Sequence, residues 1–213
     1  MPVNRYVLFF ALAIIGVAAD LITKTQVFAS HFKPLVPDVS HWWIKDVLGI
    51  QTSFNGGALF GMFQGGSFWL AGLSLVALGG ILVWMFYFKM AISRWLTVAL
   101  GMVTGGILGN LYDRMGFGYV ERHPEQTMYH VRDWIHFRLE GVWMCDPWPN
   151  FNIADSLLVT GAIMLFIYAI LVPDPMAQLA AAAAQQNGDT ASNGDTANSS
   201  DSDSEQKSEG SAQ

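Results

Sequence analysis

The chain has 213 residues, of which 52% are hydrophobic and 13% charged, and its formal net charge is −6. So large an apolar fraction, gathered in long runs, excludes an ordinary soluble domain and indicates a membrane protein. The charge is local: residues 185–213 hold six acids against one lysine, a balance of −5 that leaves −1 for the rest. The sequence has no basic patch that would indicate nucleic-acid binding. Its single cysteine, Cys145, excludes an intrachain disulfide.

Four apolar blocks are candidates for membrane spans. They cover about residues 6–29, 68–88, 95–111 and the segment that opens at Ile153 and ends at Leu171. Because a span needs about 20 residues, the second and fourth blocks qualify easily and the glycine-rich third block barely does. The first block is interrupted by Asp20 and Lys24, and its start is also typical of a cleaved signal peptide. We favour a span because the apolar pattern resumes at residues 27–29.

Two long connections, residues 30–67 and 112–151, are expected to fold on one side of the membrane. Within the second, "VRDWIHF" (131–137) alternates with period two and predicts a strand. One face of this strand, which includes Asp133, suits the membrane or a helix bundle. The other face, which includes His136, suits headgroups and water.

The last part of the chain has a different composition. From Met176 it becomes rich in Ala and Gln and then in Asn, Gly, Ser, Asp and Thr. Such a segment cannot bury enough apolar surface to fold, so residues 177–213 are predicted to be a disordered acidic tail. The folded membrane domain is therefore expected to be residues 1–176.

Polar residues recur at the ends of the apolar blocks at helical spacing, so each set lies on one helix face. The sets are Asp20 with Lys24, Asn110 with Asp113 and Arg114, Asn152 with Asp155, and Asn55 in the glycine-rich "FNGGALFG". Each set alone is also consistent with helix capping or interfacial anchoring. Because all four occur together, we expect them to converge on one site.

Five ordered motifs give the chain a resemblance to a known family. They are "DLITK" (20–24), "NGGALFG" (55–61), "GGILGNLYDR" (105–114), "VRDWIHF" (131–137) and "FNIADS" (151–156). In this order they resemble the lipoprotein signal peptidases, the bacterial type II signal peptidases, over roughly residues 5–172. The resemblance implies four transmembrane helices with a small extracytoplasmic β-sheet cradle.

The same resemblance implies an intramembrane aspartyl endopeptidase without cofactor or metal. Its substrate is a prolipoprotein, cut just before a cysteine that carries a diacylglyceryl group. The catalytic residues of the family fall on Asp133 and Asp155. Its substrate-binding or supporting residues fall on Asp20, Lys24, Asn55, Asn110, Asp113, Arg114 and Asn152. The protein is expected to act as a monomer in contact with membrane lipid.

The two carboxylates make chemical sense without the resemblance. Two aspartates a few ångströms apart do not both ionise easily, so one stays protonated. The ionised member can take a proton from water, and the protonated member can polarise a peptide carbonyl. Asp155, an acid at the start of a span, would then be half of a dyad completed by Asp133.

Some features depart from the family pattern. The segment around 121–130 reads as an insertion in the outer loop, and His136 stands where many relatives have an acid. We predict His136 to be surface-facing, since it lies on the opposite strand face from Asp133. A catalytic Cys145 with His130 or His136 stays open as a disfavoured alternative, because no third orienting group has suggestive spacing. The five histidines show no metal-site spacing.

The resemblance places the protein in the bacterial inner membrane, with both termini cytoplasmic and the active site facing the outer side. The positive-inside count favours the opposite orientation, since the long loops hold more Lys and Arg than the termini and the 89–94 loop. We override it because several loop arginines look like folded-loop or site residues.

Two other functions are consistent with the composition. One is a proton- or ion-coupled transporter that uses Asp20, Lys24, Asp113, Arg114 and Asp155 as a relay. The other is a membrane scaffold with an acidic tail. Asp133 discriminates the transporter from the peptidase, because a relay needs its acids within spans and Asp133 lies on a predicted outer strand.

Overall fold

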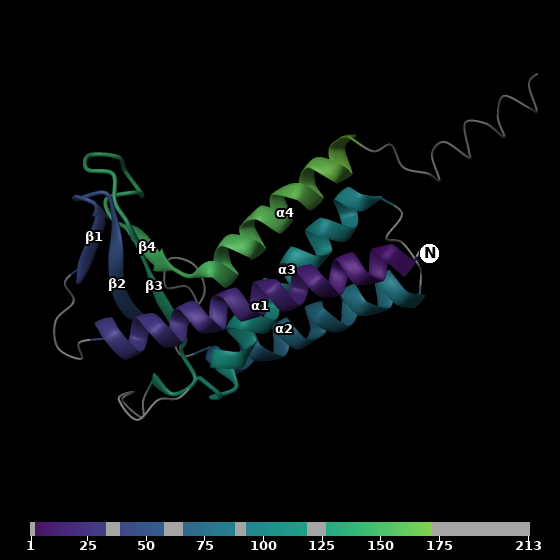
Figure 1. Cartoon of the computed structure of the whole chain (residues 1–213), viewed down its shortest axis with the longest axis horizontal. Helices are drawn as coiled ribbons and strands as arrows, with labels where there is room; N and C mark the ends of the chain where they lie inside the picture. The colour runs from purple at the N-terminus through teal and green to yellow at the C-terminus, as the bar shows by residue number, and fades with distance from the viewer. Residues whose placement is uncertain (1–2, 33–38, 58–65, 88–92, 119–126, 172–213) are drawn as a thin grey trace, which may run out of the picture. The chain divides into compact units, whose positions relative to one another are not determined.

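The computed structural model describes residues 3–32, 39–57, 66–87, 93–118 and 127–171, which form four helices and a four-stranded sheet (Figure 1). The helices are α1 (Val3–His31), α2 (Ser67–Leu82), which continues into the π-helical η2 (Val83–Tyr87), α3 (Arg94–Arg114) and α4 (Ile153–Leu171). The strands are β1 (His41–Ile44), β2 (Leu48–Asn55), β3 (Val131–Phe137) and β4 (Trp148–Phe151). The predicted tail, 177–213, and positions 121–126 of the predicted insertion lie outside the described residues.

The four predicted spans correspond to four helices that are long and apolar enough to cross a membrane. Each helix contains an 18-residue stretch with a mean hydropathy of 1.3 in α3 and between 2.0 and 2.2 in the other three. Large apolar side chains point outward from α2 and α4; Phe68 is 81% exposed and Ile170 is 65% exposed. Such exposed apolar surface suits contact with lipid. The first block is one continuous helix of 29 residues, longer than the apolar region of a signal peptide.

Helix α3 is the most buried of the four, and its glycines explain why. A Cβ on Gly105 would lie 3.2 Å from the carbonyl oxygen of Ala13 and 3.4 Å from Cα of Gly16, both on α1. A Cβ on Gly106 would lie 2.5 Å from the carbonyl oxygen of Ala154 on α4. Small residues therefore let the backbones of α1 and α4 approach α3 closely, as is common between membrane helices.

The strands form one antiparallel sheet in the order β1-β2-β3-β4. The strand predicted at 131–137 is confirmed as β3, but its predicted exposure is wrong. Arg132 is 2% exposed, and Trp134 and His136 are each 6% exposed, although alternation placed them toward headgroups and water. The reason is that other side chains lie against this face: Asp113 of α3 pairs with Arg132, and Trp42 of β1 and Asn150 of β4 contact His136.

An apolar cluster fixes the sheet to the C-terminal end of α1. Val27 and Phe28 of α1 pack with Ile50 of β2 and with Trp134 and Ile135 of β3. The sheet consequently lies at the end of the helices where α1 ends and α4 begins (Figure 1). This placement brings β3 beside the polar ends of α1, α3 and α4.

Candidate active site

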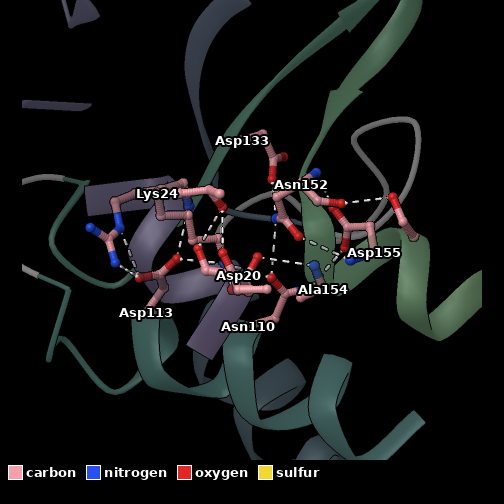
Figure 2. Close-up of polar contacts among 12 residues, drawn as sticks. Asp20, Lys24, Asn110, Asp113, Asp133, Asn152, Ala154 and Asp155 are labelled. Carbon is pink, nitrogen blue, oxygen red and sulfur yellow. Dashed lines mark hydrogen bonds and ion pairs between the residues drawn. The ribbon is translucent and has the colours of Figure 1, made fainter. Parts of the chain in front are cut away.

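A single residue, Asn152, holds both predicted catalytic aspartates (Figure 2). Its side-chain Nδ2 donates to Oδ1 of Asp133 at 2.6 Å, and its backbone N–H donates to Oδ2 of Asp155 at 3.1 Å. Asp133 comes from β3 and is 2% exposed, whereas Asp155 lies in the first turn of α4 and is half-buried. The junction of sheet and helix thus places one enclosed carboxyl group beside one that is partly accessible.

The same contacts cap α4. Asn152 immediately precedes the helix, and its Oδ1 accepts a hydrogen bond from the backbone N–H of Asp155 at 2.9 Å. With the bond from Asn152 N–H to Asp155, this is a reciprocal capping box. The capping alternative that the sequence left open is therefore correct for this pair, and it coexists with the contact to Asp133.

The orientation of the asparagine amides around the aspartates is fixed by groups that can only donate. Oδ1 of Asn55 accepts from Gly57 N–H (3.0 Å), Oδ1 of Asn110 accepts from Lys24 Nζ (3.0 Å), and Oδ1 of Asn152 accepts from Asp155 N–H (2.9 Å). Each Nδ2 must then serve an acceptor. Asn110 donates to Asp155 Oδ1 at 2.7 Å, and Asn55 donates to Asp133 Oδ2 at 3.0 Å. Every oxygen of the two carboxyl groups therefore receives one N–H.

A buried ion cluster lies directly against these amides. Lys24 Nζ is 2.6 Å from Asp20 Oδ2 and 3.0 Å from Asp113 Oδ2, and none of the three side chains is more than 1% exposed. Arg132 pairs with the other oxygen of Asp113 at 2.8 Å through Nη2. Oδ1 of Asp20 accepts from the backbone N–H of Ala154 at 2.9 Å, which links the cluster to the start of α4. Buried charges are tolerated when they are paired and hydrogen-bonded in this way.

Arg114 approaches the site from the end of α3. Its Nη2 donates to the carbonyl oxygen of Gly57 at 3.2 Å, beside the turn that orients Asn55. Its buried Nε has no hydrogen-bond partner among the residues that the structure describes. A guanidinium that lies near two carboxyl groups and has a buried N–H without an acceptor is suited to bind a substrate carbonyl.

Burial, and to a smaller extent the nearby carboxylate of Asp155, raise the pKa of Asp133 to about 8. The amide donors of Asn55 and Asn152 and the charge of Lys24 oppose this shift, because they favour the ionised form. The net effect keeps Asp133 protonated at neutral pH. A protonated carboxyl group can donate a hydrogen bond to a carbonyl oxygen.

The structure brings all nine predicted site residues into one connected set of contacts or close charges. They are Asp20, Lys24, Asn55, Asn110, Asp113, Arg114, Asp133, Asn152 and Asp155. Sequence reasoning missed Arg132, which strand alternation assigned to the water-facing side. The signal that could have found it is Asp113, an acid at the end of an apolar helix that needs a cation.

In the part of the chain that the structure describes, Cys145 forms no hydrogen bond with His130 or His136, and Nδ1 of His136 faces Asn150. Cys145 lies in the connection between β3 and β4, while His130 precedes β3 and packs against Gly56. The structure groups no three His, Cys, Asp or Glu side chains for a metal ion among the residues that it describes.

The fold is that of solved bacterial membrane enzymes. It matches one determined by the in meso method at 2.3 Å resolution with a TM-score of 0.61 and 26% identity, over 76% of this chain and 87% of that one. A second, at 1.9 Å resolution, gives a TM-score of 0.60 and 27% identity over 78% and 94% of the two chains. Four apolar helices, a small sheet and a buried polar cluster at their junction thus define the class as a membrane enzyme.

Comparison with sequences places the chain within that class. The family model of signal peptidase (SPase) II matches residues 12–171. The chain is 51% identical to the lipoprotein signal peptidase of Rhodopirellula baltica over 166 residues, covering 78% of this chain and 73% of that protein. It is 34% identical to the lipoprotein signal peptidase of Rhodococcus jostii over 172 residues, covering 81% and 77%. The chain belongs to the signal peptidase II family.

Proposed function

We propose that this protein is an aspartic endopeptidase of the bacterial inner membrane, which removes the signal peptide from diacylglyceryl-modified prolipoproteins by cutting before the lipidated cysteine. The observation that carries the proposal is the pair Asp133 and Asp155, both bonded to Asn152 and each accepting two N–H groups. Family membership supports the reaction class, and the likeness to membrane enzymes supports its setting.

The two carboxyl groups divide the chemistry of peptide hydrolysis. Asp155 lies at the N-terminus of α4, where the helix dipole favours a negative charge, and it is half-buried, so water can reach it. We assign it as the base that takes a proton from the attacking water. Asp133, protonated because it is enclosed, donates its proton to the carbonyl oxygen as the water oxygen bonds to the carbonyl carbon.

Collapse of the tetrahedral intermediate reverses these roles. The carbon–nitrogen bond breaks as Asp155 returns its proton to the leaving nitrogen, and one hydroxyl of the intermediate gives its proton back to Asp133. The amine product, the carboxylic acid product and the original protonation of the pair result. Arg114 would donate its Nε–H, which has no acceptor among the described residues, to a substrate carbonyl and so align the substrate with the attacking water.

The orientation and oligomeric state are part of the proposal. We place the sheet on the outer surface, the termini in the cytoplasm and the protein in the membrane as a monomer. A substrate whose lipid lies in the outer leaflet then meets the aspartates at the ends of α1, α3 and α4, next to the sheet. Two of the arginines that made the positive-inside count favour the opposite orientation have structural roles. Arg132 pairs with Asp113, and Arg138 pairs with Asp146.

The transporter alternative finds less support in the arrangement. A relay needs groups that exchange protons along a path, whereas Asp20, Lys24 and Asp113 are closed into mutual ion pairs and are almost completely buried. Asp133, which a relay has no use for, lies at the centre of the amide contacts on β3.

The proposed function is tested with detergent-purified protein and a diacylglyceryl-modified prolipoprotein, followed by electrophoretic mobility. We expect a product shorter by the signal peptide, whose N-terminal residue is the lipidated cysteine. The same precursor without the lipid is the matched control and should stay intact. No cleavage of the lipidated precursor, under conditions where the Rhodopirellula baltica relative cleaves it, would overturn the proposal.

A further inference from the structure

A pocket lies over the sheet, apart from the aspartates. It has a volume of about 510 Å³, and its walls include Val39, Trp42, His136, Arg138, Asp146 and Pro147. This volume is in the range of ligand sites in proteins. The pocket lies outside the four candidate spans and involves β1 and the residues before it, Gln51 of β2, β3, and the connection from β3 to β4. None of the nine site residues lines it.

The tautomer of the neutral His136 ring in this pocket can be worked out from its neighbours. Nδ2 of Asn150 donates to the carbonyl oxygen of Gln51 at 3.0 Å and to Oγ of Ser53 at 3.1 Å. This leaves Oδ1 of Asn150 facing Nδ1 of His136, at 3.0 Å, so that ring nitrogen must carry the hydrogen. In the neutral ring, Nε2 is therefore an acceptor, and no described residue bonds to it. The pocket presents this atom to a ligand that donates an N–H or O–H.

Arg138 offers hydrogen-bond donors to a ligand, whereas His136 offers an acceptor. Its Nε donates to Oδ1 of Asp146, whose Oδ2 accepts from the backbone N–H of Gly141 at 3.0 Å. The two terminal amino groups of Arg138 remain for a ligand that accepts hydrogen bonds. The positive charge of Arg138 is matched by the carboxylate of Asp146. A phosphate is a poor fit to such walls, because it would have to compete with Asp146 for Arg138.

Apolar groups complete the pocket. The ring of Trp42 stands edge-on to His136, with 5.7 Å between ring centroids. Gly49, the residue paired with Trp42 across the sheet, has no side chain, and a Cβ there would lie 2.7 Å from a methyl group of Val39 and 3.0 Å from the Trp42 ring. Trp42, Val39 and Pro147 thus offer apolar contacts beside one acceptor and one set of donors. Alternating N–H, C=O and apolar side chains are the features of an extended peptide.

We infer that this pocket binds an extended peptide segment, with a peptide N–H on His136 Nε2, a peptide carbonyl on Arg138 and an apolar side chain against Trp42. The inference rests on the proposed function for the identity of that segment: it is the part of the prolipoprotein that follows the lipidated cysteine. His136 is three residues along β3 from Asp133, about 10 Å, and on the other strand face. The bound residues therefore begin several positions after the cut.

The first experiment compares two synthetic lipidated substrates with the same signal sequence, one ending two residues after the cysteine and one ending about twelve after it. The wild type should have a KM about tenfold lower for the long substrate, as one or two well-made hydrogen bonds would give. Arg138→Met and His136→Phe should raise the KM of the long substrate to that of the short one and leave kcat and the short substrate unchanged. Lys45→Met, outside the pocket, is the control.

Three outcomes would overturn the inference. Equal KM values of the wild type for both substrates would mean that no downstream segment is bound. A KM that rises equally for both substrates in Arg138→Met would mean a purely structural role. A KM that depends on zwitterionic lipid in the micelles instead of on substrate length would assign the pocket to a headgroup.

A second measurement does not depend on catalysis. The twelve residues that follow the cysteine are made as a fluorescent peptide without lipid or signal sequence, and its anisotropy is followed with the full-length protein. We expect saturable binding that Arg138→Met weakens about tenfold. An unchanged Kd in Arg138→Met overturns the inference even where cleavage is intact, whereas normal binding without any cleavage would count against the proposed function alone.

Discussion

Asn152 and Asp155 bind each other's backbone N–H groups with their side chains, at 2.9 and 3.1 Å, and in doing so they begin α4. Because the same Asn152 also donates to Asp133 at 2.6 Å, the cap of a helix and the spacing of the two aspartates are set by one residue. A capping box normally stabilises a helix end by satisfying free N–H groups. Here it also gives the second aspartate a defined position relative to the sheet.

The first prediction concerns the aspartate pair. Asp155→Asn and Asp133→Asn each remove an ionisable group while keeping the shape of the side chain. Since both groups are needed for one proton cycle, each change should lower single-turnover cleavage at least about a thousandfold, and the double variant should be hardly worse. The measurement is single-turnover cleavage of a lipidated prolipoprotein at matched membrane abundance.

Asp133→Asn, compared with Asp20→Asn, separates the peptidase from a relay. A relay predicts a mild effect of Asp133→Asn and a severe effect of Asp20→Asn on function. Retained cleavage in Asp155→Asn would remove the base that we assign to this residue.

The second prediction concerns the buried cation. Lys24→Met leaves Asp20 and Asp113 facing each other without the ammonium group that lies 2.6 and 3.0 Å from them. Breaking a buried ion pair from one side costs about 3–5 kcal/mol, so we expect a clearly lower midpoint of thermal unfolding in detergent. Lys45→Met, in the exposed turn between β1 and β2, is the matched control and should unfold like the wild type. A Lys24→Met midpoint equal to that of the control would show that the cluster contributes nothing to stability.

Much of this arrangement could be predicted from sequence because it follows periodic patterns. The spans appear as apolar runs, β3 as an alternation with period two, and Asn152 with Asp155 as a capping signature. The exposure of β3 could not be predicted in this way. Alternation tells which side chains share a face, but it does not tell what covers that face. Arg132 is buried against Asp113 of α3, and His136 is buried against Trp42 of β1 and Asn150 of β4.

The pocket around Trp42 and His136 could not be predicted for a related reason. Its walls come from β1, β2, β3 and the segments next to them, and only His136 and Arg138, two residues apart, have a spacing that predicts a shared face. The tautomer of His136 depends on Asn150, which in turn is oriented by Gln51 and Ser53 of β2. Such properties follow from strand pairing and not from any local pattern.

The third prediction concerns the turn that orients Asn55. The imidazole of His130 occupies the space that a Cβ on Gly56 would need. Gly56→Ala should therefore shift this turn, move the Asn55 amide from Asp133 and lower kcat about a hundredfold, as misplacement by about 1 Å does in enzymes. Kinetics of cleavage at saturating substrate measures the effect.

Two further variants test the steric origin of that loss. Gly56→Ala combined with His130→Ala removes the obstructing ring and should recover most of the activity. Gly79→Ala, on the outward side of α2 with nothing within 4 Å of the added methyl group, should behave like the wild type. A double variant as impaired as Gly56→Ala alone would mean that the backbone of the turn, and not contact with His130, requires glycine.

The fourth prediction follows from the raised pKa of Asp133. In the unfolded chain this carboxyl group titrates near 3.8, whereas burial and the Asp155 carboxylate raise its pKa in the folded protein to about 8. Between these values the folded state holds a proton that the unfolded state has released, so this group makes the protein less stable as pH rises from about 4 to about 8, with no further loss above. Thermal midpoints in detergent from pH 5 to 9 should fall more steeply for the wild type than for Asp133→Asn, which cannot titrate. Asp146→Asn is the control: the N–H of Gly141 and the guanidinium of Arg138 lower the pKa of Asp146, so this group stays ionised from pH 5 to 9 and its removal should leave the slope of the midpoint curve unchanged. Parallel midpoint curves for the wild type and Asp133→Asn would mean that Asp133 is ionised in the folded protein and cannot be the proton donor.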